Sequence, residues 1–291
     1  IFHNLHYGGT SPYTLSNNTI TGVVNANETL WDGILLSSLS VGSTSSANTI
    51  NGSAISNPSE GYEVWNIKST SPAVITGGSV SGVNTGIFIN NYDGYVSDAV
   101  DGAHASISSI SITPNVAGTG IRIFDNPLAT SNAYVQAIVG AGVVITNGAN
   151  GLIVENETAQ AISPVGNMAF SGQSSDHIKL INNANNIDAT AASFNGIPGG
   201  SATISQLYTI EDKINHKIDL NSLGFVTVKA SNSYVTPNSF TTPNTTPSVQ
   251  RGIDAVAANG TVHIQSGTTY TGGADASAKT VTLAPGASPS C

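Results

Sequence analysis

The amino-acid sequence predicts an all-β fold, a right-handed parallel β-helix with coils of about 25–35 residues. Three observations lead to this prediction. Apolar residues recur about every 30 residues, and within each recurrence they alternate with variable residues, as on a half-buried strand. Only 9% of the 291 residues are charged. Helices of soluble proteins usually carry charged outer faces, so a largely helical fold is not expected.

A short motif, small-x-apolar-small-Gly, marks one strand of each predicted coil. Its apolar centres lie 30 residues apart, at Ile20, Ile50, Val80 and Ile110. Phe170 and Phe194 continue the series at a shorter spacing. An antiparallel β-sandwich is the alternative, but such a fold has no reason to keep a register of this length.

A second motif, Gly-apolar-x-apolar, interleaves with the first. It begins at Gly33, Gly61, Gly86, Gly120 and Gly151, and a related segment begins at His177. The intervening residues Glu63, Arg122 and Lys179 are expected to point outward. The apolar members are expected to share one interior; they are Ile34, Leu36, Val64, Ile87, Ile89, Ile121, Ile123, Leu152, Val154, Ile178 and Leu180.

A polar column follows the second motif. Five residues after each start stand Ser38, Asn66, Asn91, Asp125, Asn156 and Asn182. Stacked coils bring equivalent residues to about 4.8 Å from one another, close enough for side chains to hydrogen-bond along the stack. Asparagine also tolerates the left-handed backbone conformation that such turns need. The column therefore predicts a structural ladder.

The chain divides into three predicted parts. Residues 1–202 form the β-helix, residues 203–247 form a connecting segment, and residues 248–291 form a capping helix and the first coil of a second, truncated β-helix. In the connecting segment, Ile210, Ile214 and Ile218 fall four residues apart. This spacing predicts a short amphipathic helix.

The segment from 248 onward resembles the amino-terminal capping unit of right-handed parallel β-helix proteins. The matching pieces are Val249-Gln250, Ile253-Asp-Ala255, Gly260-Thr-Val-His-Ile264 and Gly267-Thr-Thr-Tyr270, the last with one additional Thr. In such proteins the capping helix covers the open edge of the first coil, which would otherwise pair with other chains. The resemblance therefore implies that a second β-helix begins here.

Residues 167–240 resemble a unit that links successive β-helices in large, multi-domain, adhesin-like surface proteins of bacteria. The matching pieces include Phe170-Ser-Gly-Gln173, Ile187-Asp-Ala-Thr190, Phe194-Asn-Gly196 and Ile210-Glu-Asp-Lys-Ile-Asn-His216. The resemblance implies secretion, exposure at the cell surface and a multi-domain parent protein. It implies no defined reaction.

The charge and the cysteine content of the chain make several classes of function unexpected. The net charge is -9 and only 8 residues are basic, so a nucleic-acid interface is not expected. No apolar run has the roughly 18 residues of a membrane span, so no membrane insertion is expected. The single cysteine, Cys291, cannot form an internal disulfide, and no Cys/His cluster indicates a metal. The chain begins with Ile1 and lacks a signal segment, which suggests an interior piece of a longer polypeptide.

These observations favour a structural or adhesive extracellular module, able to assemble into fibres. The expected partners are neighbouring β-helix domains of the same polypeptide, identical subunits, and glycans. Neither a catalytic residue nor a cofactor is expected under this interpretation. The expected location is the cell surface.

The alternative is a polysaccharide lyase, a glycoside hydrolase or a carbohydrate-binding β-helix, since the fold alone does not decide function. The candidate catalytic residues are Asp93, Asp98, Asp101 and Asp125, and a lyase of this type would also use calcium. Roles in turns explain them more simply, because Asp93 precedes Gly94 and Asp125 belongs to the polar column.

Three residues are candidates for ligand binding. Trp65 and Phe124 occupy the same position of the second motif, and Arg122 lies beside Phe124. Aromatic rings on an outer face can stack against sugars, although packing beneath a neighbouring loop is the competing explanation.

Overall fold

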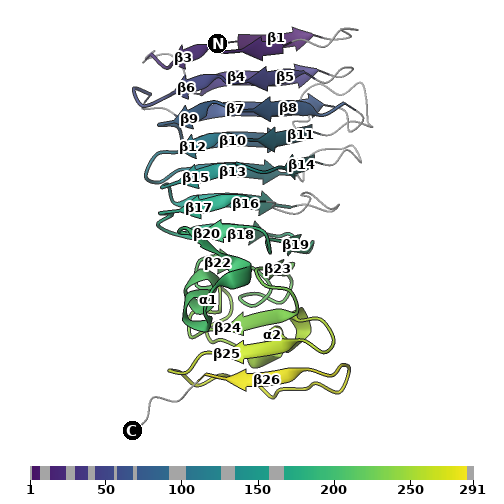
Figure 1. Cartoon of the computed structure of the whole chain (residues 1–291). Coiled ribbons are helices and arrows are strands. Elements are labelled where there is room, and N and C mark those ends of the chain that lie inside the picture. The colour runs from purple at the N-terminus through teal and green to yellow at the C-terminus, as the bar shows by residue number, and fades with distance from the viewer. Residues whose placement is uncertain are drawn as a thin grey trace.

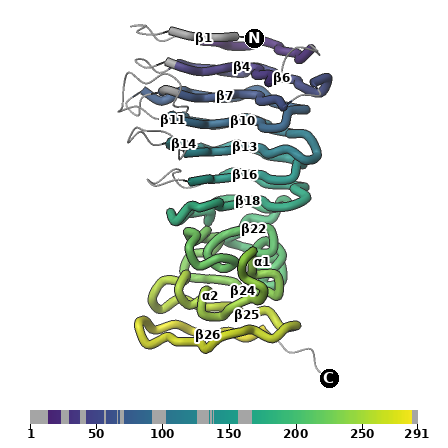
Figure 2. Tube along the Cα trace, turned by 180° about the vertical axis from the view of Figure 1, so that it is seen from behind, coloured from purple at the N-terminus to yellow at the C-terminus, as the bar shows by residue number. Residues whose placement is uncertain are grey.

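A computed structural model describes residues 2–6, 14–23, 30–38, 43–55, 58–67, 71–91, 103–125, 135–156 and 167–286. The chain forms a parallel β-solenoid of about 7 turns, with strands stacked like rungs (Figure 1). The two ends of the chain lie at opposite ends of the stack (Figure 2). The predicted stacked, parallel β-helix is confirmed. Neither of the two helices in the described part is long and apolar enough to cross a membrane.

Three parallel sheets run along the solenoid, and from β1 to β15 successive strands belong to sheets A, B and C in turn. Sheet A contains β1 (Phe2–His6), β4 (Trp31–Ser38), β7 (Ser59–Ile67), β10 (Thr85–Asn90), β13 (Thr119–Phe124), β16 (Asn150–Glu155), β18 (Asp176–Ile181) and β22 (Ile214–Asn215). Sheet B contains β2 (Thr14–Ser16), β5 (Thr44–Ser46), β8 (Ala73–Thr76), β11 (Ala103–Ser108) and β14 (Val135–Val139).

Sheet C carries the apolar centres of the first motif. It contains β3 (Thr19–Thr21), β6 (Thr49–Asn51), β9 (Ser79–Ser81), β12 (Ser111–Thr113), β15 (Val144–Thr146), β17 (Ala169–Ser171), β20 (Ser193–Phe194) and β21 (Ile197–Pro198). All neighbours pair in parallel except β20 and β21, which form an antiparallel hairpin. Pro198 lacks an amide hydrogen, so this hairpin ends the sheet.

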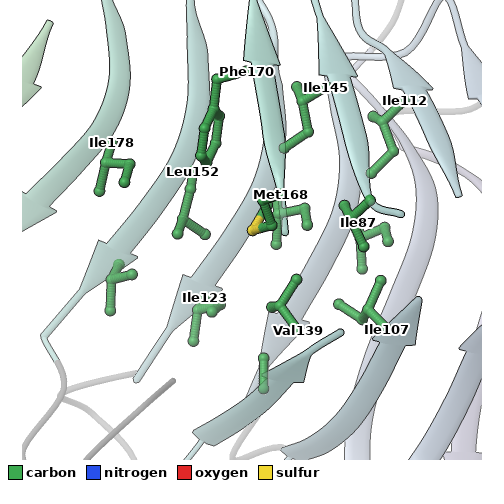
Figure 3. Close-up of a cluster of buried hydrophobic side chains, with 14 of the residues drawn as sticks. Ile87, Ile107, Ile112, Ile123, Val139, Ile145, Leu152, Met168, Phe170 and Ile178 are labelled. Carbon is green, nitrogen blue, oxygen red and sulfur yellow. The ribbon is translucent and has the colours of Figure 1, made fainter. Parts of the chain in front are cut away.

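The core is a set of vertical files of apolar side chains. In sheet A, Ile87 pairs with Ile121, Ile121 with Leu152, and Leu152 with Ile178. Figure 3 shows Ile87 near Ile107 and Ile112, and Leu152 near Phe170, inside the solenoid. All eleven residues predicted to share this interior are buried, so that prediction is confirmed.

Glycine begins each strand motif because sheet A approaches sheet C most closely there. A Cβ added to Gly86 would lie 2.3 Å from Ile112 Cγ2 and 2.5 Å from the carbonyl oxygen of Gly120. Gly120 has the same relation to Ile145 on the next turn, at 2.4 Å. The Gly-apolar-x-apolar motif is therefore a packing requirement of the stack.

At the corner between sheets B and C, the residue that follows the sheet B strand has a left-handed backbone conformation in four successive turns. These residues are Asn17, Ala47, Gly77 and Ser109, with φ between 52° and 68°. One such residue redirects the chain sharply, so each turn can pass from one sheet to the next without a loop.

The carboxyl-terminal part contains short strands and helices. They are β19 (Ile187–Asp188), a 3₁₀ turn (Gly199–Ser201), α1 (Ile204–Glu211), β23 (Val226–Thr227), β24 (Asn232–Val235), α2 (Val249–Ala255), β25 (Thr261–Ile264) and β26 (Thr282–Pro285). β24, β25 and β26 form a parallel sheet, and β19 pairs with β23. A second hydrophobic core lies in this part of the chain and contains Ile218, Phe225, Val235, Ile253, Val256 and Val262.

The helix predicted from Ile210, Ile214 and Ile218 is wrong in its position. A capping box between Thr203 and Gln206 begins α1 earlier, and the helix ends at Glu211. Ile214 instead pairs with Ile178 in sheet A, and Ile218 belongs to the second core. The three isoleucines thus pack into two hydrophobic cores and do not form one face of a helix.

Candidate functional site

Three of the four candidate catalytic residues, Asp93, Asp98 and Asp101, lie outside the described residues. The fourth, Asp125, directly follows β13 and is buried. Its carboxylate accepts a hydrogen bond from Nδ2 of Asn91, one turn earlier, and its backbone amide donates to the carbonyl of Glu155, one turn later. The structure therefore places Asp125 among hydrogen-bond partners of the adjacent turns.

The polar column contains hydrogen-bonded pairs between neighbouring turns among its described side chains. Besides Asn91 and Asp125, Asn182 Nδ2 donates to Asn156 Oδ1 at 3.1 Å. Asn156 and Asn182 both have left-handed backbone conformations, with φ of 58° and 50°. The side chains of Ser38 and Asn66 lie outside the described part of the structure. Where it is described, the column links neighbouring turns at the end of each sheet A strand.

Arg122 is the centre of a rigid group on the outer face of sheet A. Its guanidinium carbon lies 5.2 Å from the ring centroid of Phe88 and 4.9 Å from that of Phe124. The two rings stack at 6.3 Å with an interplanar angle of 21°. Glu155, on the next turn, accepts hydrogen bonds from Nε at 3.1 Å and Nη2 at 2.6 Å. Cation–π contacts and this ion pair hold the guanidinium in one orientation.

Trp65 lies on β7, two strands from Phe124 in the order of sheet A. It is half-buried, and the strand between them carries Asn90 opposite Phe124. Phe124 stacks against Phe88, which belongs to the variable position of the motif. The structure brings Arg122 and Phe124 together, and it places Trp65 on a strand two steps away in the sheet.

An acidic group lies on the same outer face, toward the amino-terminal end. Asp32 on β4 pairs with Glu60 on β7, and Glu63 follows on the same strand. One carboxylate oxygen from each of the three residues lies within 4.8 Å of the others. All three residues are half-buried. Among the described residues, these three carboxylates form the group whose ligand atoms lie close enough to one another to hold a metal ion.

Burial and mutual repulsion keep protons on this group. Burial, then Glu63 and Asp32, raise the pKa of Glu60 to about 9, and Arg122 offsets only part of this effect. Burial and Asp32 raise the pKa of Glu63 to about 7. At neutral pH the Glu60 carboxyl is therefore a hydrogen-bond donor.

Sequence reasoning missed Asp32 and Glu60 as members of a site. The signal was present, because each directly precedes the glycine of the second motif, in Asp32-Gly33 and Glu60-Gly61. Strict alternation would have placed both on the inner face, because Asp32 lies two residues before the buried Ile34 and Glu60 two residues before the buried Tyr62. Polar residues before a glycine are common in turns, which explains why the pattern was not distinctive.

The acidic group and the Arg122 group together form what we call the outer strip. It consists of Asp32, Glu60, Glu63, Phe88, Arg122, Phe124 and Glu155, carried by five adjacent strands from β4 to β16. The strip offers ring surface, a fixed guanidinium, a protonated carboxyl and carboxylates. Such a combination can stack against sugar rings and hydrogen-bond to hydroxyl groups.

Comparison of the chain with protein-family models, with curated proteins and with solved structures finds no match.

Proposed function

We propose that the chain is a structural and adhesive module of an extracellular surface protein, and that it binds glycans through the outer strip. The observation that carries this proposal is the Arg122 guanidinium, which lies against the rings of both Phe88 and Phe124 and is fixed by Glu155. A guanidinium fixed in this way can donate to sugar hydroxyl or carboxylate oxygens without losing side-chain entropy on binding. The adjacent carboxyls supply further polar contacts.

The solenoid supports the structural part of the proposal. Each turn buries its apolar residues only against its neighbours, so the stack is a stiff rod that can grow by adding turns. The parent protein is proposed to be bacterial, secreted and multi-domain, in keeping with the resemblance of residues 167–283. Neighbouring β-helix domains or identical subunits are the proposed protein partners.

The proposed function is tested by the binding of immobilised glycans to the full chain and two variants. In Arg122→Leu we expect affinity for the recognised glycan to fall by about tenfold or more, because a central anchor is removed. Lys179→Leu is the matched control, since Lys179 lies in the same outward column two strands away. Circular dichroism checks that both variants fold. Equal affinity in the two variants, or no glycan bound by the unaltered chain, would contradict the proposal.

A second candidate is glycoside cleavage by the acidic group. The favouring observation is that Glu60, protonated at neutral pH, lies beside Glu63 and Asp32, as a general acid lies beside a second carboxylate in glycosidases. If so, Glu60→Gln and Glu63→Gln each reduce turnover of a bound glycan by about a hundredfold or more. Asp176→Asn, also on sheet A, should leave turnover unchanged. Binding without turnover in the unaltered chain would leave only the adhesive role.

A further inference from the structure

The two hydrophobic cores meet at the segment that follows α1. Ile210 and Ile214 pack in the first core and Ile218 packs in the second. Figures 1 and 2 show α1 between the stacked turns and the carboxyl-terminal sheet. The same segment carries three buried ionisable residues, which we call the junction cluster: Glu211, His216 and Asp219, with 5%, 0% and 7% of their surface exposed.

Hydrogen bonds fix the position of the proton on His216. The backbone amide of Val226 donates to Nδ1 at 3.0 Å, so Nδ1 keeps its lone pair. The ring proton is therefore on Nε2, which lies 2.7 Å from Oε1 of Glu211. The ring also stacks on Phe225 at 5.2 Å. Burial lowers the pKa of His216, but the hydrogen-bonded Glu211 and the nearby Asp219 raise it above its ordinary value, so the ring and the two carboxylates share additional protons.

Asp219 is the carboxylate placed to take such a proton. Its Oδ2 accepts the backbone amide of His216 at 2.9 Å. The charged or titratable groups that face it are His216, Glu211 from α1 and Arg251 from α2. Burial is the main cause that raises its pKa to about 7, and Glu211 raises it further, while His216 and Arg251 act in the opposite direction.

The surroundings of Glu211 add to the excess of negative charge. Burial raises its pKa, and the neighbouring Asp212 acts in the same direction. Its position in the last turn of α1 places it at the negative end of the helix dipole. Tyr208 and Tyr234 are the remaining titratable side chains near it, and both hydroxyls stay protonated because burial raises their pKa. Arg251 donates instead to the carbonyls of Ser239 and Thr246.

We propose that the junction cluster is a proton-dependent joint: proton uptake by Asp219 tightens the packing of the carboxyl-terminal turns on the first core, and proton loss loosens it. A carboxyl that binds its proton more tightly when folded stabilises the fold fully at low pH. That stabilisation is lost as the pH rises from the unfolded value of 3.8 through the folded value of about 7. Acid therefore strengthens this joint, the opposite of its effect on carboxylates whose pKa is lowered by ion pairs or hydrogen bonds.

Hydrogen exchange of the full chain tests the proposal. Exchange is followed by mass spectrometry at pH 5.5 and pH 8.5 and corrected for the intrinsic rates. We expect protection of the amides from 211 to 226 to be about tenfold or more weaker at pH 8.5. Amides from 140 to 156, in the first core, are the internal reference. Equal or greater protection of 211–226 at pH 8.5, relative to this reference, would overturn the proposal.

Two variants distinguish the effect of protonating Asp219 from general effects of pH on the protein. Asp219→Asn keeps an oxygen for the His216 amide but carries no charge, so the protection of 211–226 should depend less on pH. Asp254→Asn, on the exposed side of α2, is the matched control and should keep the pH dependence. If Asp219→Asn does not fold, Glu211→Gln, which retains the acceptor for Nε2, should reduce the pH dependence. The proposal is contradicted if a folded Asp219→Asn variant keeps the full pH dependence. If that variant does not fold, the same result for Glu211→Gln contradicts it.

Discussion

At the scale of the residue, glycine and histidine occupy the same position of the second motif for different reasons. Gly86 leaves room for Ile112, whereas His177 closes the series where sheet C carries phenylalanines. The His177 ring lies 6.1 Å from Phe170 and 5.5 Å from Phe194, and Nδ1 is 2.8 Å from Gln173 Oε1. Burial lowers its pKa to about 4, so the ring is neutral and packs as an aromatic group.

The close contact at Gly86 leads to a stability prediction. In Gly86→Ala the added methyl group must displace Ile112 or the backbone at Gly120, because both lie within 2.5 Å of its position. We expect the free energy of unfolding to fall by about 1–3 kcal/mol in urea titrations. Gly200→Ala is the control, since its nearest atom is Thr190 O at 3.7 Å. An unchanged unfolding midpoint for Gly86→Ala would mean that the sheets pack less closely than described.

At the scale of the element, the strands of sheet A were predictable and the helix α1 was not. The alternation in Gly120-Ile-Arg-Ile123 sets which side chains face inward, and one parallel neighbour on each side keeps that register. For α1, the deciding features were the capping box at Thr203 and the pairing of Ile214 with β18. The first is a local contact of two side chains and the second depends on the finished stack, so apolar spacing alone could not place the helix.

The members of the outer strip were also only partly predictable from the sequence. Phe124 was a candidate because it occupies the same motif position as Trp65, and Arg122 because it lies beside Phe124 on an outward position of the same strand. Phe88, Glu155, Asp32 and Glu60 belong to other turns, and their roles depend on which outward residues the stack brings together. Membership of a site on a solenoid is therefore a property of register between turns, which a motif read along one strand does not contain.

At the scale of the whole molecule, the stacking of turns determines both the core and the outer strip. The acidic group and the Arg122 group share one face only because β4, β7, β10, β13 and β16 are consecutive neighbours in sheet A. The first core extends from Ile20 to Tyr234 as one cluster. The junction cluster lies where this core meets the second, so protonation there affects how the two parts pack and leaves the strip unaltered.

The most direct test is the distance between spin labels on two outward residues of sheet A, Glu63→Cys on β7 and Lys179→Cys on β18, in a Cys291→Ser background. The two strands are four steps apart in the sheet order. At about 4.8 Å per step, their Cα atoms should be separated by roughly 19 Å, and pulsed electron resonance should give one narrow distribution near that value once the label arms are included. A broad distribution, or one centred beyond about 35 Å, would contradict the stacked register and with it the outer strip.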